Sequence, residues 1–201
     1  MRYDIYRKDY LEDLARIVME TWHFEKDLKN PKDPMLINRY YIKSCLIGSV
    51  HQDVVVENGR ALGVLFGSDE RRGGLAKALA FAGLGVRFLG EILLGRLGQR
   101  RAALRMIREM SWMSRAGEAV KGFDSEVNLF ILSGETRGKG YGRALMDRYL
   151  DFCRGQGMKK IFLWTTPTCT YSFYDRYGFQ RIRTVERGNG EAVMIYAIEV
   201  K

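Results

Sequence analysis

The sequence predicts a single mixed α/β domain, and three observations support this fold class. A strand-like run at 126–132 is followed by a glycine-rich turn and a helix-like run at 142–153. The pair Asn58-Gly59 lies between two apolar runs, which is a strong hairpin signal. Apolar residues recur at three- and four-residue steps between residues 75 and 113, as in amphipathic helices. With 201 residues, 46% of them hydrophobic, one well-buried domain (1–201) is expected.

The other elements follow from the same patterns. Near the N-terminus a strand at 3–7 precedes a helix at 9–22, and residues 53–57 and 60–66 form the two strands of the hairpin. After the helix at 142–153 the sequence predicts a strand at 159–165 and a helix that ends near residue 179. A second hairpin, with strands at 181–185 and 192–200, closes the chain.

Composition narrows the classes of protein. No run of 18 uncharged apolar residues occurs, so no membrane-spanning helix is expected, and the N-terminal residues lack the apolar stretch of a signal peptide. Three scattered cysteines, Cys45, Cys153 and Cys169, form no disulfide framework, so a cytoplasmic location is expected. The two histidines, His23 and His51, have no partners at metal-ligand spacing, so no metal is expected.

The net charge of +9 is concentrated in one segment. Residues 71–122 contain 11 Lys and Arg against 3 Asp and Glu, a net charge of +8, whereas the rest of the chain has 22 against 21, a net charge of +1. The same segment separates the predicted third strand from the fourth. We therefore interpret 71–122 as a basic helical insertion in the domain.

Two helices are predicted inside the insertion. The first carries an apolar stripe made of Leu75, Leu79, Ala82, Val86, Leu89, Leu93 and Leu97, which is widened by Phe81, Leu84, Phe88 and Ile92. Its charged residues Lys77, Arg87 and Glu91 gather on the remaining side. Several glycines weaken this helix by roughly 1 kcal/mol each relative to alanine, so packing must hold it or it breaks in two. The second helix, at about 99–115, has an apolar side of Leu104, Ile107, Met110 and Met113 and a basic side of Arg101, Arg105, Arg108 and Arg115.

Three interpretations of the insertion stay open. In the first, the helical hairpin packs over the core with a solvated arginine face. In the second, it also forms the roof of a substrate pocket. In the third, it binds anionic lipid or nucleic acid. Nucleic acid is less favoured than lipid, because only Trp112 lies among these arginines.

The stretch 137–142, Arg-Gly-Lys-Gly-Tyr-Gly, is the most informative motif. Its glycines allow a ligand to approach the backbone, and the following helix N-terminus offers free N–H groups to a phosphate. A P-loop requires Ser or Thr after Gly-Lys, where this chain has Gly140. A dinucleotide loop requires glycine at the sixth position, where this chain has Arg143. The pattern R-x-x-G-x-G fits without a gap, and an ordinary glycine-rich turn is the alternative.

That pattern is the acyl-coenzyme A loop of the GNAT N-acetyltransferase family, which the chain resembles over nearly its whole length. The predicted elements agree with the family in order, type and spacing. The stretch 172–179, Ser-Phe-Tyr-Asp-Arg-Tyr-Gly-Phe, is similar to the family's F-Y-x-K-x-G-F helix end. The resemblance implies a twisted, mostly antiparallel sheet with helices on both faces, and the insertion falls between its strands 3 and 4.

The resemblance also implies acetyl-coenzyme A as cosubstrate. Backbone groups of Phe130, Ile131 and Leu132 would pair with the pantetheine arm as a β-strand would, and the N–H of Leu132 would face the thioester oxygen. Backbone amides of the loop would hold the pyrophosphate, and Lys139 and Arg143 would either add charge or be solvated. The implied cofactor-binding residues of the loop are Arg137, Gly138, Lys139, Gly140, Tyr141, Gly142 and Arg143.

Two catalytic residues are implied. An amine with a pKa near 10.4 is neutral in only about one molecule in 2,500 at pH 7, so a general base is useful. Glu126 stands at the family's spacing from the loop, although a surface glutamate with water as the base is the alternative. Tyr174 is the expected general acid, or else a core tyrosine. Tyr171 and Tyr177 share its helix face, but only Tyr174 matches the register of the motif.

Two positions depart from the family pattern. The asparagine frequent at the end of the fifth strand is absent, so Thr166 or Thr168 would take its place. The usual alanine of the next helix is Thr170. Cys169 lies near the start of that helix, where a thiolate is favoured, but no histidine is placed to activate it.

The predicted function is direct transfer of an acetyl group from acetyl-coenzyme A to a primary amine of a small molecule or a protein. The alternative is a non-catalytic coenzyme A-binding module whose insertion docks on anionic lipid or nucleic acid. No carboxylate cluster indicates a polycationic acceptor, so the sequence leaves the acceptor unidentified. Whether the protein forms a homodimer stays open.

Overall fold

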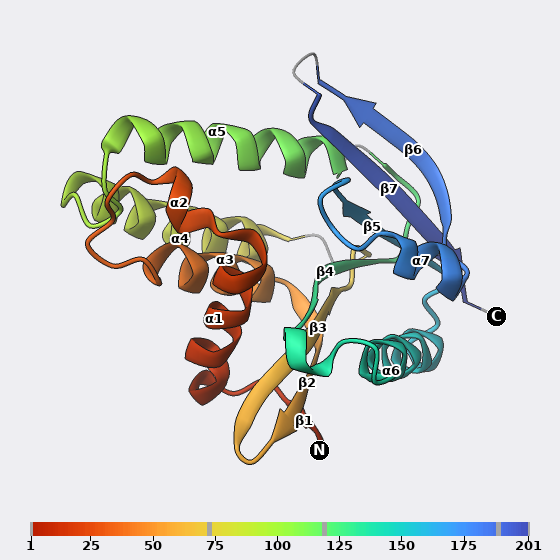
Figure 1. Ribbon diagram of the computed structural model, residues 1–201. Helices are drawn as coiled ribbons and strands as arrows, with labels where there is room; N and C mark the ends of the chain where they lie inside the picture. The colour runs from red at the N-terminus through yellow and green to blue at the C-terminus, as the bar shows by residue number, and fades with distance from the viewer. Residues whose placement is uncertain (1, 72–73, 118–119, 188–189, 201) are drawn as a thin grey trace.

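A computed structural model describes residues 2–71, 74–117, 120–187 and 190–200. Within these ranges one sheet has the strand order β1-β2-β3-β4-β5-β7-β6 (Figure 1). Its strands are β1 (Arg2–Ile5), β2 (Ser49–Glu57), β3 (Arg60–Ser68), β4 (Ser125–Leu132), β5 (Lys160–Thr165), β6 (Gln180–Glu186) and β7 (Ala192–Glu199). The α-helices are α1 (Leu11–Trp22), α2 (Phe24–Asp27), α3 (Leu36–Leu46), α4 (Leu75–Leu93), α5 (Arg100–Gly117), α6 (Tyr141–Gly155) and α7 (Ser172–Tyr177). The predicted mixed α/β class is confirmed.

The predicted hairpin between the second and third strands is confirmed. Asn58 and Gly59 have φ angles of 50° and 79°, the two positive values that a type I′ turn requires. Strands β6 and β7 form the second predicted hairpin, and residues 188–189 of its turn lie outside the described residues.

The sheet is antiparallel except where β4 meets β5. These two strands run parallel and pair only through Ser125 with Ile161 and Glu126 with Phe162. Beyond that point β4 continues beside β3, while β5 continues beside β7. The two strands therefore part in the middle of the sheet and leave an opening between them.

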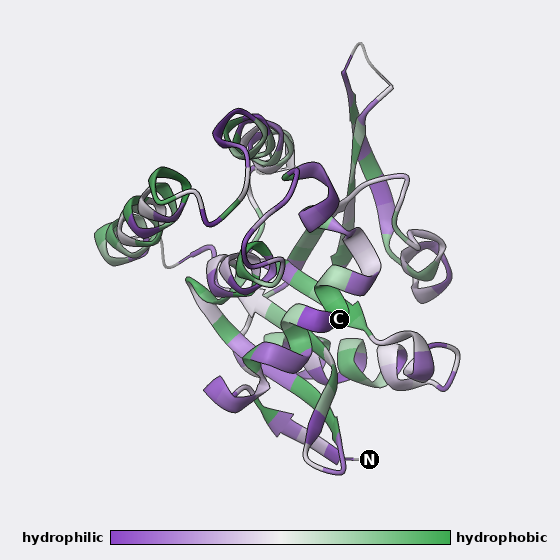
Figure 2. Cartoon of the chain, turned by 60° about the vertical axis from the view of Figure 1, so that its left-hand side comes forward, coloured by the Kyte–Doolittle hydropathy of each residue, from purple (hydrophilic) through white to green (hydrophobic). Residues whose placement is uncertain are grey.

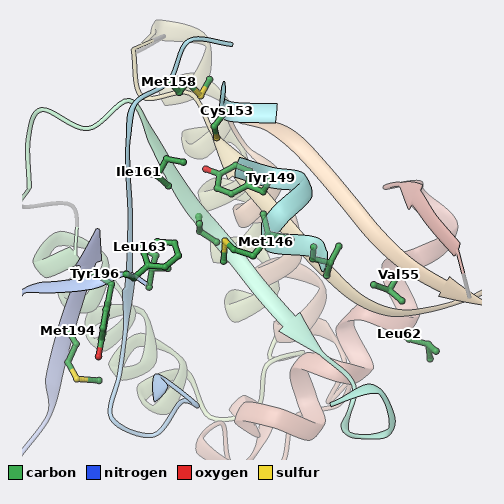
Figure 3. Packing of buried hydrophobic residues seen from close by; sticks show 14 residues of the cluster. Val55, Leu62, Met146, Tyr149, Cys153, Met158, Ile161, Leu163, Met194 and Tyr196 are labelled. Atoms are coloured by element: carbon green, nitrogen blue, oxygen red, sulfur yellow. The ribbon is translucent and has the colours of Figure 1, made fainter. Parts of the chain in front are cut away.

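Helices cover both faces of the sheet, as expected. On one face α6 contributes Leu145, Met146 and Tyr149 to a buried cluster with residues of β2 to β5 and β7 (Figure 3). On the other face α1 and α3 pack on β2, β3 and β4 through residues such as Leu14 and Ile42. The hydrophobic core is therefore divided by the sheet into two layers.

A bulge in β4 changes which face its side chains meet. Val127 pairs with Gly67 and Leu129 with Phe66, so two residues of β4 are accommodated against one step of β3. Val127 consequently packs with the α6 layer, whereas Leu129, two residues later, packs with the α1 and α3 layer. The bulge turns the first part of β4, which holds Glu126, independently of the second part.

The side chain of Tyr149 ties α6 to the sheet at the start of β4. Its hydroxyl lies 2.6 Å from the hydroxyl of Ser125, which in turn donates to the carbonyl oxygen of Ser68. The ring of Tyr149 lies against Gly67, where an added Cβ would enter the ring. Glycine at this position lets α6 approach the sheet closely enough for the hydroxyl contact.

The predicted insertion appears as the helices α4 and α5 between β3 and β4, and residues 72–73 and 118–119 of it lie outside the described residues. The turn between the two helices docks on the chain after α2, because the N–H of Gln99 donates to the carbonyl of Leu28. Gly98 lies so close to the carbonyls of Leu28 and Lys29 that a side chain there would overlap them. Within the described residues, no helix is both long and apolar enough to cross a membrane.

The apolar stripe of α4 packs on the core only in part. Of its seven central residues only Leu97 is buried, and it lies after the end of the helix, whereas Leu75 and Val86 are 76% and 70% exposed. The inward side carries Phe88 and Ile92, which join a cluster with residues of α2, α3 and α5. Periodicity identifies the apolar side of a helix but not the direction in which it points. Helix α4 lies at the outer edge of the molecule (Figure 2).

The apolar side predicted for α5 is correct only in part. Ile107, Met110 and Met113 pack against neighbouring clusters, but Leu104 is exposed, and the buried face is built mainly on small residues and Met106. At the end of the helix Gly117 lies against the ring of Trp164 on β5. Small residues on this face let α5 approach the rest of the domain closely.

We expect Gly67→Ala to lower the free energy of unfolding by about 1–3 kcal/mol, because the new methyl group would push Tyr149 out of its place. Gly83→Ala is a matched control, since no atom lies within 4 Å of its Cβ position on α4, and it should be neutral or stabilising by up to about 1 kcal/mol. Urea unfolding compares the two variants with the wild type. Equal midpoints for all three proteins would contradict the packing at Gly67.

A second prediction concerns His51, which is buried on β2 between the rings of Tyr149 and Phe152. Burial lowers its pKa, nearby Asp53 opposes this effect, and Arg148 adds to it. In the unfolded chain His51 binds a proton below about pH 6.5, whereas in the folded state it binds the proton only at a lower pH. Stability should fall as the pH drops below about 6.5, and His51→Gln should reduce the loss. Urea unfolding of both proteins at pH 7.5 and pH 5.5 measures this loss of stability. An identical pH dependence in both proteins would refute the role of His51.

Candidate active site

The opening between β4 and β5 widens into a cavity of about 2140 Å³. Its walls come from the parted strands, the glycine-rich loop, the ends of α1 and α3, both helices of the insertion, and the start of α7. The insertion contributes Gly74, Lys77, Ala78 and Phe81 from α4 and its N-terminal side and residues 109–115 from α5. The cavity thus joins the predicted cofactor loop to a separate region covered by the insertion.

The glycine-rich loop presents the N-terminus of α6 to this cavity. Gly138 and Gly140 have φ angles of 75° and 85°, a region that favours glycine, and Gly140 is the N-cap residue. Among the residues that the structure describes, no side chain caps the helix, and its first turn holds no acidic residue. Gly142 is buried, and a Cβ there would lie 3.1 Å from a methyl carbon of Leu132. The free N–H groups and the helix dipole form a site suited to a phosphate.

The side chains of the loop have different surroundings. Arg137 donates from Nε to the carbonyl of Leu132 at 3.3 Å and from Nη2 to the hydroxyl of Thr21 at 3.3 Å, so it links the loop to β4 and α1. Arg143 lines the cavity and lies over the ring of Tyr177 at 5.5 Å. Lys139 is exposed and does not line the cavity, whereas Tyr141 packs against the α6 layer.

The three residues of β4 that are predicted to contact the cofactor differ in the direction in which their backbone groups point. The N–H of Ser133 donates to the carbonyl of Leu62 on β3, so the N–H of the preceding residue, Leu132, points toward the opening. By the same alternation the backbone groups of Phe130 also face the opening. Ile131 is the exception, because its carbonyl faces Gly63 of β3 and its side chain is buried. Ile131 nevertheless lines the cavity, so the contact expected from it stays a prediction.

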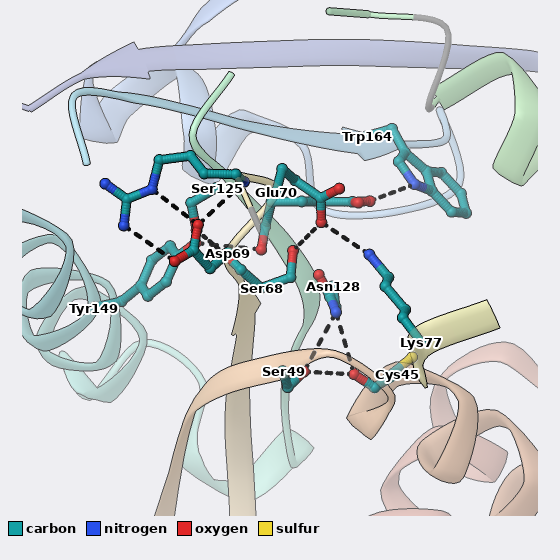
Figure 4. Close-up of polar contacts among 12 residues, drawn as sticks. Cys45, Ser49, Ser68, Asp69, Glu70, Lys77, Ser125, Asn128, Tyr149 and Trp164 are labelled. Atoms are coloured by element: carbon teal, nitrogen blue, oxygen red, sulfur yellow. Dashed lines mark hydrogen bonds and ion pairs between the residues drawn. The ribbon is translucent and has the colours of Figure 1, made fainter. Parts of the chain in front are cut away.

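Glu126 lies at the last point where β4 and β5 pair. The indole N–H of Trp164, on β5, donates to its Oε1 at 3.0 Å (Figure 4). Both side chains line the cavity. The carboxylate is thus held at the base of the opening by a strand other than its own.

Tyr174 lies on the opposite wall, at the start of the short helix α7. Its ring packs among Phe130, Phe173, Phe179 and Tyr196 at centroid distances of 5.6–6.4 Å. Burial raises the pKa of Tyr174, and the neighbouring thiol of Cys169 and hydroxyl of Tyr196 add to the shift. The phenol therefore stays protonated across the neutral pH range.

The two neighbouring tyrosines have other surroundings. The hydroxyl of Tyr177 donates to Asp147 at 2.5 Å, on the side of α7 that faces α6. Tyr171 is 37% exposed and does not line the cavity. Of the three tyrosines on this stretch, Tyr174 is the one that lines the cavity.

Comparison with known proteins identifies the domain. Residues 99–179 match the profile of the Acetyltransferase (GNAT) family. The match spans 81 of the 201 residues, so this part of the chain is similar to the GNAT family. This finding confirms the resemblance found in the sequence and supports acyl transfer as the general activity.

Solved structures match the fold over the whole chain. An aminoglycoside 6'-N-acetyltransferase in complex with coenzyme A is 10% identical, with a TM-score of 0.59, over 100% of this chain and 98% of the other. Ard1 from Thermoplasma volcanium is 15% identical, with a TM-score of 0.57 and coverages of 100% and 97%. The ribosomal-protein-S18-alanine N-acetyltransferase from Escherichia coli is 11% identical, with a TM-score of 0.54 and coverages of 100% and 94%. At these identities the likeness shows the fold alone. No curated protein matches the sequence.

The cavity wall also holds a polar cluster that sequence reasoning missed. Glu70, just after β3, accepts a hydrogen bond from Ser68 at 2.5 Å and forms an ion pair with Lys77 of α4 at 3.1 Å (Figure 4). Nearby, Asn128 donates to the carbonyl of Cys45 and the hydroxyl of Ser49. The seven-residue spacing between Glu70 and Lys77 gives no signal in the sequence, because the two side chains meet only once the insertion is folded.

Cys169 lies in the cavity wall close to Tyr174. Burial alone would raise the pKa of Cys169, but hydrogen bonds from Thr166, Thr165 and Trp22 outweigh it and lower the pKa. The hydroxyl of Thr166 lies 2.7 Å from that of Thr168 and 3.5 Å from the sulfur. The two threonines expected to replace the family's asparagine are therefore bonded to each other at the end of β5.

Proposed function

We propose that this protein transfers an acetyl group from acetyl-coenzyme A to a primary amine. The observation that carries the proposal is the parting of β4 from β5 directly beside the uncapped N-terminus of α6. An extended pantetheine arm would pair with the open backbone groups of Phe130 and Leu132. The pyrophosphate would then lie on the amides of residues 137–142, near Arg143. This arrangement directs the thioester toward Tyr174 and the region under the insertion.

The proposed chemistry divides between the two walls of the opening. The acceptor's ammonium group must lose a proton before it can attack as a neutral amine, and Glu126 accepts this proton through a water molecule. The N–H of Leu132 stabilises negative charge that develops on the carbonyl oxygen, and loss of such a donor typically raises the barrier by about 3 kcal/mol. The new carbon–nitrogen bond forms as the carbon–sulfur bond breaks, and Tyr174 protonates the departing sulfur. The second proton that the nitrogen loses then restores the phenol. Because its raised pKa also makes Tyr174 a weaker acid, proton transfer accompanies bond cleavage.

The acceptor enters from the side covered by the insertion. That region combines aromatic side chains, Trp22, Phe81 and Trp112, with the carboxylates of Glu20, Asp27, Glu70, Glu109 and Glu126. Such a lining suits a positively charged amine that is carried on an apolar or aromatic group. A panel of amines assayed by thiol release would identify the acceptor class.

Tyr174→Phe should lower kcat by about 100-fold or more, because removal of a general acid typically costs 10²–10⁴ in rate. Acetyl-coenzyme A affinity, measured by calorimetry, should stay unchanged. Tyr171→Phe is the matched control and should retain wild-type turnover. If the wild type binds the cofactor but turns over no amine in the panel, the protein is a binding module and the proposed reaction is wrong.

Glu126→Gln should lower kcat/KM at pH 7 by about 10²-fold, because the acceptor then lacks its base. The deficit should shrink as the pH rises toward the amine's own pKa near 10.4, where the neutral amine becomes abundant. Profiles of kcat/KM between pH 6 and pH 10 for both proteins test this. A deficit that is constant with pH would show that Glu126 acts in some way other than as a base.

A further inference from the structure

Helix α4 turns its apolar side outward. Leu75, Leu79, Val86, Leu89 and Leu93 lie one to two turns apart along one side, and each is about half to three-quarters exposed. With Ala82 between Leu79 and Val86, they recur every three or four residues and form a continuous stripe over the whole 19-residue helix. The stripe ends at Leu94, which is also exposed. A stripe of this length on the described surface exceeds the scattered apolar residues usual for a protein surface.

Specific contacts fix this orientation. On the opposite side of α4, Lys77 reaches inward to Glu70, and the ring of Phe88 packs on Tyr40 at 4.8 Å. Glu91, on the same side, forms an ion pair with Arg96 at 3.0 Å. Rolling the helix to bury its stripe would break the contacts with Glu70 and Tyr40. The outward stripe is therefore a property of the folded domain.

Positive charge surrounds the stripe. Residues 75–117 hold eight Lys and Arg against two Glu, a net charge of +6. Arg87 is exposed on α4 itself, and Arg100 donates to the carbonyl of Leu93 at 2.7 Å, which places it at the end of the stripe. Arg101, Arg105 and Arg108 are exposed on the adjoining helix α5. An apolar stripe flanked by arginines is the pattern of a helix that lies in a membrane interface.

We propose that α4 and the arginines of α5 dock this protein on an anionic phospholipid surface. The leucines and Val86 enter the boundary between headgroups and acyl chains, and the arginines contact lipid phosphates. Lys77 and Phe88 keep the other side of α4 on the protein. The stripe residues named here do not line the cavity, so docking goes beyond the proposed acetyl transfer and does not depend on it.

Charge favours lipid over a second copy of the chain. In a symmetric dimer built on this patch, each copy would bring the same net positive charge against the other, which opposes association. An anionic bilayer complements both the charge and the apolar stripe.

The side chains also favour lipid over RNA. The stripe is aliphatic, whereas single-stranded RNA is bound by aromatic rings that stack on its bases. Trp112, the one tryptophan of α5, lines the cavity and has Arg187 over its ring at 5.1 Å. It is therefore not displayed beside the exposed arginines.

Vesicle flotation of the full chain tests the proposal. The wild type should float with vesicles of phosphatidylglycerol and phosphatidylcholine in equal parts and stay behind with pure phosphatidylcholine. The double variant Val86→Glu/Leu89→Glu should lose binding. Arg101→Gln/Arg105→Gln should bind at least tenfold more weakly, at about fivefold for each arginine near the surface. Ile182→Glu, which changes an exposed residue of β6, is the matched control and should float like the wild type.

Further measurements separate docking from misfolding and from the other partners. All variants should keep their thermal midpoint and their thiol-release turnover with a water-soluble amine. Equal flotation with pure phosphatidylcholine, or retained binding of the Val86→Glu/Leu89→Glu variant, would overturn the proposal. The proposal would also fail if the wild type bound no vesicles and light scattering showed that it is a dimer, whereas the Val86→Glu/Leu89→Glu variant is a monomer. RNA binding without vesicle binding would overturn it as well.

Discussion

The site depends on the way Tyr149 holds the start of β4. Its buried hydroxyl meets Ser125, and Ser125 also bonds the backbone of β3, so α6, β3 and β4 are joined at one point. Ser125 and Glu126 are also the residues at which β4 pairs with β5. Beyond this junction β4 bulges and follows β3 alone, which opens the cavity. The proposed base lies at the junction, and the cofactor loop lies where β4 ends.

Local patterns predicted the parts of the site that are local in the chain. The glycines at 138, 140 and 142 indicated a tight turn before a helix N-terminus, and the structure shows that turn with positive φ angles at the first two. Tyr174 was distinguished from its neighbours by register, and it is the one of the three that lines the cavity. The orientation of the Ile131 backbone could not be predicted in this way, because it depends on which neighbouring strand each amide faces.

The insertion shows the limit of periodicity more clearly. The sequence gives α4 an apolar side and a charged side, and burial of the apolar side is the usual outcome. Here Glu70, which precedes the helix by five residues, draws Lys77 inward, and Phe88 fills the space beside Tyr40. Contacts between residues of different elements therefore decide the orientation. Such contacts leave no trace in the spacing of a single helix.

The opening between β4 and β5 also has a cost for an empty protein. Unpaired strand edges attract other extended chains and are a common starting point for aggregation. The end of α5, with Gly117 against Trp164, covers part of β5 and limits access to its edge. A ligand that occupied the opening as a strand would remove the remaining exposed backbone groups. A cofactor that pairs with this backbone, as we propose, would therefore also protect the domain from aggregation.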